Sequence, residues 1–305
     1  MRVNKGLALI VVLWVVTLLT IMASSFALTI QRETMISASL KEKAQASALA
    51  EAGINYAVLM LLSKDEEQRW QANSSLYEIK IAGKRIRMLI ADESGKISIN
   101  KASKEQLQQL FDSLAVEETL SDSISDAILD WRDKNDLHRI NGAEQPQYEE
   151  AGLNYSPRND LFESVEELQM VMGMTAEIYR QIEAMISIYT KSKNINPVTA
   201  TREVLLTLPD INADMVDEYL LQRVESERNG EKVGPPDWYR GGSSNSRVYM
   251  IIAEAMINED ISEKIMAVIK LGRAKNDSPF QILKWVEGYP VPSLFLPANN
   301  QRVIN

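Results

Sequence analysis

An acidic segment near the middle of the chain holds the side chains best suited to binding a metal ion. Asp130, Asp133 and Asn135 stand close together, Glu144 follows a glycine and an alanine, and Asn159 comes later. Carboxylate and amide oxygens on a loop are the ligands that Ca²⁺ prefers, because it takes about six to eight oxygen atoms. The spacing therefore predicts a calcium site with Asp133 and Glu144 as ligands, joined by Asn135, Asp130 and Asn159. The alternative is a solvated acidic loop whose carboxylates cap turns.

The rest of the composition argues against catalysis. Cysteine is absent, which excludes disulfides, thiolate chemistry and cysteine-ligated metals. The single histidine, His138, has no neighbouring pattern of a catalytic base and is expected on the surface. Nucleophile-elbow, zincin and phosphate-loop motifs do not occur. We expect a protein that is not an enzyme and has no small-molecule substrate, in which Trp131 and Tyr148 pack the acidic loop onto a helix.

A long apolar segment at the N-terminus must position the rest of the chain. Leu7 to Ile30 carries no charged residue, and Arg2 and Lys5 precede it. At about 1.5 Å per residue this helix would be roughly 36 Å long, enough to cross about 30 Å of hydrocarbon. The basic leader favours a cytoplasmic N-terminus.

The same helix is expected to continue to about Leu62, because apolar side chains recur at every fourth position: Ile36, Leu40, Ala44, Ala48 and Ala52. From residue 76 to 100 the period changes to two, which predicts short antiparallel strands around 77–81, 86–90 and 97–99. A second group of strands is expected at 248–257, 265–271 and 280–286. Between the groups, residues 101 to about 235 have a helical pattern. The chain therefore predicts an α+β fold with an inserted α domain.

Three segments of the insert resemble helix-hairpin-helix units. Ser103 with Gln106 and Ser164 with Glu167 have capping-box spacing, so each pair predicts the start of a helix. Such units often bind DNA phosphates, which requires a positive surface. Residues 101–240 carry 14 Lys and Arg against 27 Asp and Glu, and Asp210 replaces a hairpin glycine. These charges argue for a structural role and against binding of nucleic acid.

The leader resembles a class III, type IV pilin-like signal, because Lys5-Gly6 directly precedes the apolar run. The resemblance implies that a prepilin peptidase cleaves after Gly6 and that the amine of Leu7 is methylated. Most pilins and pseudopilins carry Glu at the fifth mature position, where this chain has Val11. That departure is similar to the K-type minor pseudopilins of type II secretion, the general secretion pathway protein K family.

Two further motifs in the insert resemble the K-type family. The segment from Ile195 to Ala200 resembles its I-N-x-N-T-A motif, with Val198 in place of the second Asn. The acidic segment is similar to the family's W-x-D-x-D, G-A-E and Y-x-x-x-N segments, where calcium is bound, although Asn135 stands where the family tends to have Asp. That change removes one negative charge, which would weaken the site or leave it empty.

The resemblance implies a pseudopilin fold, with a long N-terminal transmembrane helix packed on a small antiparallel sheet and a large inserted all-α domain of helix-hairpin-helix-like units. The expected regions are a leader at 1–6, a helix at 7–64 (7–30 transmembrane), sheet at 65–100, the α domain at 101–240, sheet at 241–289 and a loosely held tail at 290–305. A long surface loop is expected at 230–245.

The function implied is that of a minor pseudopilin at the tip of the type II secretion pseudopilus, which helps to initiate assembly and secretion across the outer membrane. It implies a single-pass protein of the bacterial inner membrane with a periplasmic body. Its partners would be other minor pseudopilins and the prepilin peptidase. Two alternatives remain open: a signal-anchored periplasmic binding or scaffold protein, and a DNA-uptake pilus component.

Overall fold

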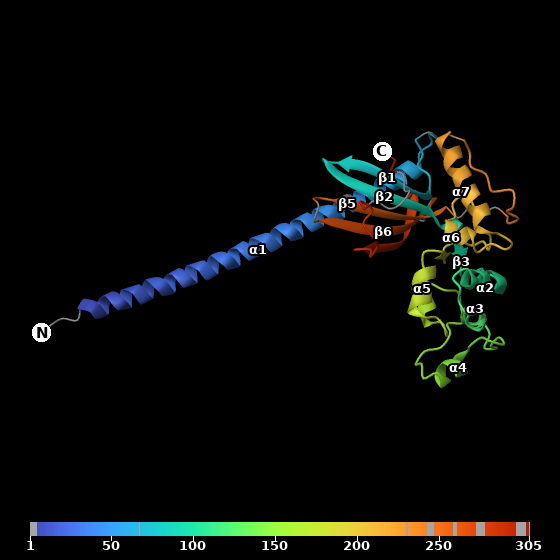
Figure 1. The fold of residues 1–305 in the computed structure, drawn as a ribbon, viewed down its shortest axis with the longest axis horizontal. Coiled ribbons are helices and arrows are strands. Elements are labelled where there is room, and N and C mark those ends of the chain that lie inside the picture. Colours follow the sequence, from blue (N-terminus) through green and yellow to red (C-terminus); the bar gives the residue numbers. More distant parts are fainter. Residues whose placement is uncertain are drawn as a thin grey trace.

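The molecule consists of a long N-terminal helix, a sheet and a helical domain at the end of the sheet farthest from the N-terminus (Figure 1). The computed structural model describes residues 5–66, 68–229, 231–242, 247–258, 261–272, 278–296 and 303–304. Residues 1–4 of the predicted leader and 297–302 and 305 of the predicted tail lie outside the described residues.

Helix α1, Lys5–Leu61, confirms the predicted continuous helix. Its N-terminal half projects away from the body (Figure 1), and the large apolar side chains from Leu9 to Ile30 are 46–74% exposed. From Leu9 onward, the first buried side chain of α1 is that of Ala46. Among the described residues, α1 is the one helix whose length and hydropathy suffice to cross a membrane. It therefore fits a single-pass anchor.

The main sheet is formed by strands from both sides of the insert. Its order is β7-β6-β5-β2-β1-β8, and neighbouring strands are antiparallel except β1 and β8. The bounds are β1 Asn73–Ile81, β2 Lys84–Asp92, β5 Val248–Met256, β6 Ser262–Leu271, β7 Phe280–Glu287 and β8 Val303–Ile304. Five of these strands confirm the two predicted groups, since the alternation of apolar residues places one set of side chains on each face.

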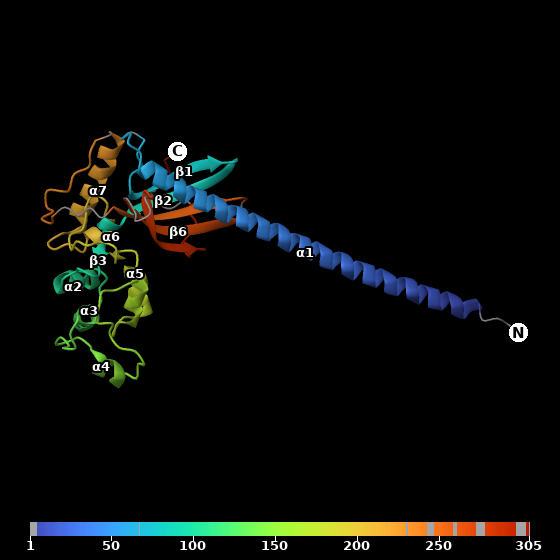
Figure 2. The same cartoon turned by 180° about the vertical axis from the view of Figure 1, so that it is seen from behind.

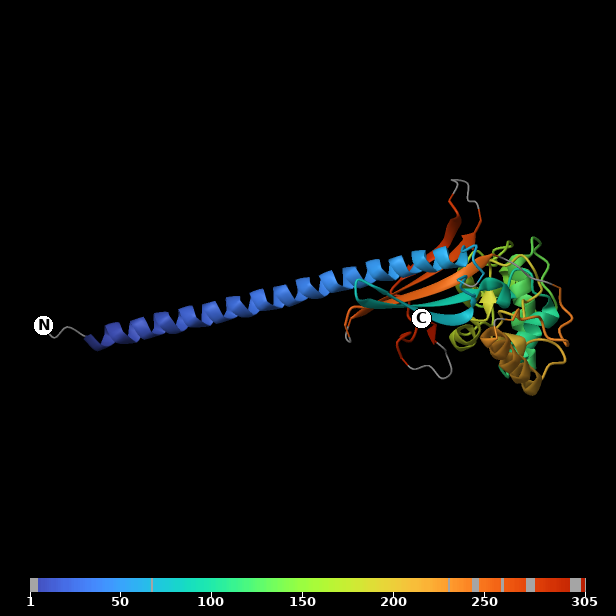
Figure 3. The same ribbon diagram turned by 90° about the horizontal axis from the view of Figure 1, so that it is seen from above.

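The C-terminal half of α1 covers one face of the sheet (Figures 2 and 3). Small residues allow this close approach: a Cβ atom on Gly53 would lie 2.7 Å from the Cγ2 atom of Ile86 on β2. The core between helix and sheet contains residues of α1, β2, β5 and β6, including Ala50, Ile54, Ala57, Val58, Met88, Ile251, Ala253, Ile265 and Ala267. Burial of this apolar surface is the main force that holds α1 on the sheet.

The other face of the sheet is covered by the segment 289–296. Tyr289, Val291 and Leu294 pack against an apolar cluster that contains Val248, Ile252, Met266 and Val268. The prediction of a loosely held tail is therefore wrong for residues 290–296. Periodicity missed this segment because its order comes from contacts with distant strands.

The inserted domain has its own apolar core and contains mostly short helices. Their bounds are α2 Lys104–Asp112, α3 Glu118–Arg132, α4 Gln145–Glu150, the 3₁₀ helix η2 Val165–Met170, α5 Ala176–Ile182, α6 Arg202–Leu205 and α7 Ala213–Arg228. Ser103 accepts a bond from the N–H of Gln106, and Ser164 forms a capping box with Glu167, so both predicted helix starts are confirmed. The hairpin residues Ala115, Gly173 and Asp210 all have positive φ.

One strand prediction differs from the structure. Ile97–Ser98 forms strand β3, which pairs with β4, Ile186–Ser187, in a separate two-stranded sheet. Ile97 and Ile99 belong to the core of the inserted domain. The chain therefore leaves the main sheet at Asp92, passes through the 3₁₀ helix η1, Glu93–Gly95, and enters the insert earlier than residue 101. Alternation alone cannot tell which sheet a short strand will join.

The insert is fixed to the sheet at η1. The N–H of Asn196 donates to the Ser94 carbonyl at 2.8 Å. A Cβ atom on Gly95 would lie 2.7 Å from the carbonyl oxygen of Thr199, so only glycine allows this approach. An ion pair of 2.5 Å between Lys284 on β7 and Glu166 in η2 adds a second link. These contacts hold the insert at the end of the sheet.

Candidate functional site

The acidic loop connects two helices at the end of the inserted domain farthest from the sheet (Figure 1). Asp130 lies in the last turn of α3, Asp133 is the C-cap of α3, and Glu144 is the N-cap of α4. Trp131 and Tyr148 pack behind the loop with ring centroids 6.1 Å apart, which confirms their expected packing role. Helix ends thus position the two carboxylates expected as principal ligands, since unpaired backbone groups there favour polar capping residues.

Arg139 joins two of the predicted ligands. Its guanidinium donates hydrogen bonds to Asp130 Oδ1 and, at 2.6 Å, to Asp133 Oδ2. Its backbone N–H also donates to Asp130 Oδ2 at 3.1 Å. The carboxylate of Asp130 is fully buried, and burial raises its pKa while the bonds from Arg139 oppose that change. The arginine therefore supplies a positive charge to a buried carboxylate.

Each of the two predicted amide ligands donates a hydrogen bond to an aspartate of the loop. The amide of Asn135 donates to Asp133 Oδ1 at 2.7 Å, and the Asn135 side chain is exposed. The amide of Asn159 donates to Asp136 Oδ1 at 2.7 Å. The carbonyl oxygen Oδ1 of Asn159 is buried and has no hydrogen-bond partner among the described residues.

Glu144 has the most perturbed acidic group of the loop. It is 2% exposed, and its Oε1 atom has no partner within the described part of the chain. The pKa of Glu144 is raised to about 7, mainly by burial and to a smaller extent by the negative charges of Asp130, Asp133 and Asp136. A carboxylate that is buried among like charges favours either a proton or a cation.

The structure links four of the five predicted ligands to the loop in two groups and leaves Glu144 without a bond to either group. Asp130, Asp133 and Asn135 are linked through side-chain bonds, and Asn159 is linked to Asp136. Among the described residues, no group of three or more Asp, Glu, His or Cys side chains is arranged to hold a metal ion. The oxygen donors are of the type that Ca²⁺ prefers, and Glu144 Oε1 and Asn159 Oδ1 are buried without a hydrogen-bond partner among the described residues. Sequence reasoning missed Arg139, whose only signal was a basic residue inside an acidic loop.

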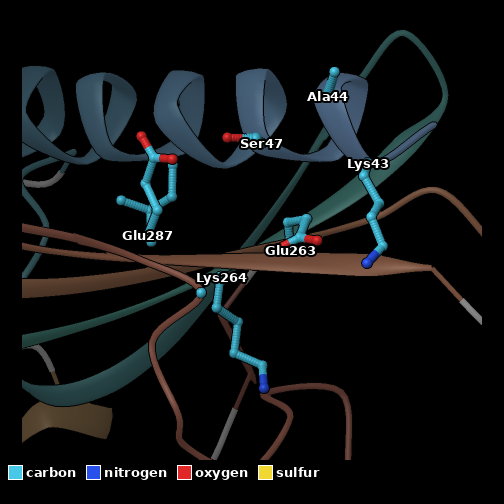
Figure 4. A pocket seen from close by; sticks show the side chains of 8 residues that line it. Lys43, Ala44, Ser47, Glu263, Lys264 and Glu287 are labelled. Carbon is cyan, nitrogen blue, oxygen red and sulfur yellow. The ribbon is translucent and has the colours of Figure 1, made fainter. Parts of the chain in front are cut away.

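Other positions offer less chemistry. His138 is exposed, as expected. A pocket of about 330 Å³ lies between α1 and the strands β6 and β7, lined by Lys43, Glu263, Lys264 and Glu287 among others (Figure 4). Its side chains come from the packing of α1 on the edge of the sheet, and charges of both signs line it. The pocket contains none of the predicted site residues.

Comparison with known proteins gives one family. Residues 86–191 match the model of the family "Type II secretion system (T2SS), protein K". The type II secretion system protein K of Dickeya chrysanthemi is 29% identical over 52% of this chain and 46% of its own length, so the match spans about half of that relative. The protein K of Pseudomonas aeruginosa is 23% identical over 96% of both chains.

A solved structure has the same fold. It is that of the GspK-GspI-GspJ complex from the type 2 secretion system of enterotoxigenic Escherichia coli, with a TM-score of 0.53 and 16% identity over 85% of this chain and 98% of the matched chain. The likeness extends over most of the chain and confirms the predicted α+β architecture. The matches in sequence and fold agree: the chain is similar to the protein K family of type II secretion systems.

Proposed function

We propose that the protein is a minor pseudopilin at the tip of a type II secretion pseudopilus, where it takes part in initiating assembly and in secretion across the outer membrane. The observation that carries the proposal is α1, a single helix whose N-terminal half is apolar and exposed while its C-terminal half is built into the sheet. The similarity to type II secretion system protein K supports the same role.

The N-terminal half of α1 would anchor the chain in the inner membrane, with the N-terminus in the cytoplasm and the body in the periplasm. The apolar segment is long enough to span a bilayer, and Arg2 and Lys5 favour this orientation. A prepilin peptidase would cleave between Gly6 and Leu7 and leave the helix on the mature chain, with its amine methylated.

Beyond the membrane, α1 would pack against the helices of other minor pseudopilins. Met35, Ile36 and Leu40 are 60–65% exposed although they lie outside the apolar segment. Exposed apolar side chains in such a row favour a helix–helix interface. The solved neighbour of similar fold is a complex of three such proteins, GspK, GspI and GspJ, and we infer that this chain joins an equivalent complex.

The role is one of assembly without chemical turnover. The inserted domain lies at the end of the molecule opposite the N-terminus (Figure 1), so in a filament of parallel helices it would occupy the end. A domain of this size above the sheet would block the addition of further subunits. The alternative of a DNA-uptake component has no support in the acidic charge of residues 101–240.

Co-purification tests the proposal. The full-length chain, solubilised in detergent with the two other minor pseudopilins of its own system, should form a ternary complex. Ile36→Lys/Leu40→Lys should weaken that complex, because two charges would face the partner helices. Gln45→Lys adds a charge to the same helix at another exposed position and is the control. A chain that stays monomeric with both partners at micromolar concentration contradicts the proposal.

We also propose that the acidic loop binds Ca²⁺. Asp133 and Glu144 would be the principal ligands, with Asp130, Asn135 and Asn159 as further oxygen donors. Bound calcium would neutralise the carboxylates that face one another in the loop. Because the loop joins α3 to α4, its order affects the whole end of the inserted domain.

A further inference from the structure

The acidic loop contains its own cation. Of the basic residues between 130 and 144, Arg132 donates to the carbonyl oxygens of Ile99 and Ala102, and Lys134 is exposed. Arg139 alone among them bonds the loop carboxylates. Its guanidinium bridges Asp130 and Asp133, which are two of the oxygen donors proposed for calcium. A cation could not coordinate the same oxygens while the guanidinium occupies them.

The bridge is built so that the guanidinium can leave. The Arg139 side chain is 37% exposed, while its neighbour Ile140 is 97% exposed and offers no packing to hold it. Asp130 keeps one bond without the guanidinium, since the backbone N–H of Arg139 donates to Oδ2. The N–H of Gly142 donates to the Arg139 carbonyl at 3.0 Å and closes the turn. A Cβ atom at Gly142 would lie 1.9 Å from Asp130 Oδ2, so the turn needs glycine here.

The loop also has acceptors that Arg139 does not fill. Glu144, with 98% of its surface buried, keeps Oε1 unpaired in the described part of the chain, as does Asn159 with Oδ1. One guanidinium therefore pairs with two carboxylates, Asp130 and Asp133, and leaves Oε1 of Glu144 unpaired. A divalent cation would bring twice the charge and more coordination positions than the arginine. The loop thus has two competing ways to neutralise its carboxylates.

We propose that Arg139 is the resident cation of this loop, which keeps the loop folded without metal and must leave Asp130 and Asp133 before a divalent cation binds. The inference rests on the proposed calcium site, but its test separates the two. Arg139 weakens calcium binding and makes the order of the loop less dependent on calcium. Asn135 lacks the negative charge that an Asp would carry at this position, and this also weakens calcium binding.

The test compares the full-length chain in detergent with Arg139→Gln, using CaCl₂ and MgCl₂ as probes. Arg202→Gln is the matched control, because it removes one charge from the same domain at an exposed pair with Asp217. Isothermal titration gives the calcium affinity. Hydrogen exchange of residues 133–144, read by mass spectrometry, gives the order of the loop.

The proposal expects Arg139→Gln to exchange faster than the wild type in chelator and to regain protection in calcium. It also expects calcium to bind the variant roughly tenfold more tightly, in the range of ordinary coupling between two competing ligands. Arg202→Gln should leave the calcium affinity and the hydrogen exchange of residues 133–144 as they are in the wild type. Arg139→Lys keeps the positive charge but lacks the planar set of guanidinium N–H donors. Its calcium affinity and its exchange rate in chelator should therefore lie between those of the wild type and of Arg139→Gln.

Each other outcome decides the matter. Equal calcium affinity in wild type and Arg139→Gln overturns the competition, as does faster exchange that calcium does not reverse. Unchanged exchange of the variant in chelator overturns the role of Arg139 as resident cation. Calcium binding by Arg139→Gln with none by the wild type supports the proposal and refutes calcium binding by the natural chain. No calcium binding by either overturns both.

Discussion

The buried carboxylate of Glu254, on the central strand β5, accepts hydrogen bonds from the Ser293 hydroxyl at 2.9 and 3.0 Å. It also accepts from the Leu294 N–H at 2.5 Å and from the Ser262 hydroxyl at 2.8 Å. Arg87 adds a bond of 2.8 Å to the Leu294 carbonyl. A charged group inside the protein thus holds the segment 289–296 on the sheet.

Glu254→Gln should therefore loosen that segment. The amide replaces an acceptor with a donor that faces other donors, and a hydrogen bond to a charged group contributes about 1.5–3 kcal/mol. We expect the free energy of unfolding to fall by about 1–3 kcal/mol and proteases to cleave the segment 289–296 faster. Glu263→Gln, on β6, is the control. Equal proteolysis of both variants would mean that apolar packing alone holds the segment.

Gly53→Val should weaken the contact between α1 and the sheet. Its side chain would meet Ile86, and overpacking a core costs about 1–3 kcal/mol. The better helix propensity of any residue other than glycine or proline would offset at most about 1 kcal/mol. Ala48→Val, at an exposed position of the same helix, should change stability little. Denaturant unfolding measures both, and a Gly53→Val chain as stable as Ala48→Val would disprove the close packing.

The stability of the sheet should depend on pH, because the carboxylate of Glu78 is paired in the folded chain. Hydrogen bonds and charges of Arg85 and Arg87 lower the pKa of Glu78 from 4.5 to about 2. Because the folded chain holds the proton less tightly, the contribution is complete above pH 4.5 and is lost as the pH falls toward 2. Glu78→Gln should cost about 1–3 kcal/mol at pH 7 and much less at pH 2.5. An equal cost at both pH values in urea unfolding would rule out the charge as its cause.

Cleavage at Gly6 tests the membrane assignment. Co-expression with a prepilin peptidase should remove Met1 to Gly6 and leave an N-terminal Leu7 that carries a methyl group. Gly6→Val should abolish cleavage, because the peptidase signal ends at that glycine. Peptide mass spectrometry reads the N-terminus. An intact Met1 with the peptidase present, or cleavage beyond Ala23, would be incompatible with a pseudopilin.

Calcium should stabilise the full-length chain in detergent relative to chelator. At 100 times its dissociation constant a ligand adds about 2.7 kcal/mol, and each kcal/mol raises Tm by about 2–4 °C in a domain of 150–250 residues. Mg²⁺ should do much less, because it requires a tight octahedron and keeps its waters. Asp133→Ala/Glu144→Ala should remove the shift, whereas the exposed Glu150→Ala should keep it. Calorimetry that shows no calcium shift in the wild type, or an equal one in the double variant, would leave only a solvated acidic loop.

Local patterns in the sequence determined α1, five strands of the main sheet and the helical nature of the insert. Each of these follows from interactions between near neighbours: the uncharged run from Leu7 to Ile30, the alternation from 76 to 90, and the caps Ser103 and Ser164. The packing of Trp131 was predictable for the same reason. Such signals depend on spacing along the chain, which the sequence shows directly.

Only the tertiary structure decided the contacts between distant residues. It placed Ile97 beside Ile186 in a second sheet, and it bound Ser293 to Glu254 across 39 positions of sequence. It also put Arg139 between Asp130 and Asp133, where the sequence had suggested only oxygen ligands. These pairs form because burial makes unpaired polar groups costly and each group takes the nearest partner in space. Which partner is nearest depends on how the helices and sheets pack, and no local pattern encodes that.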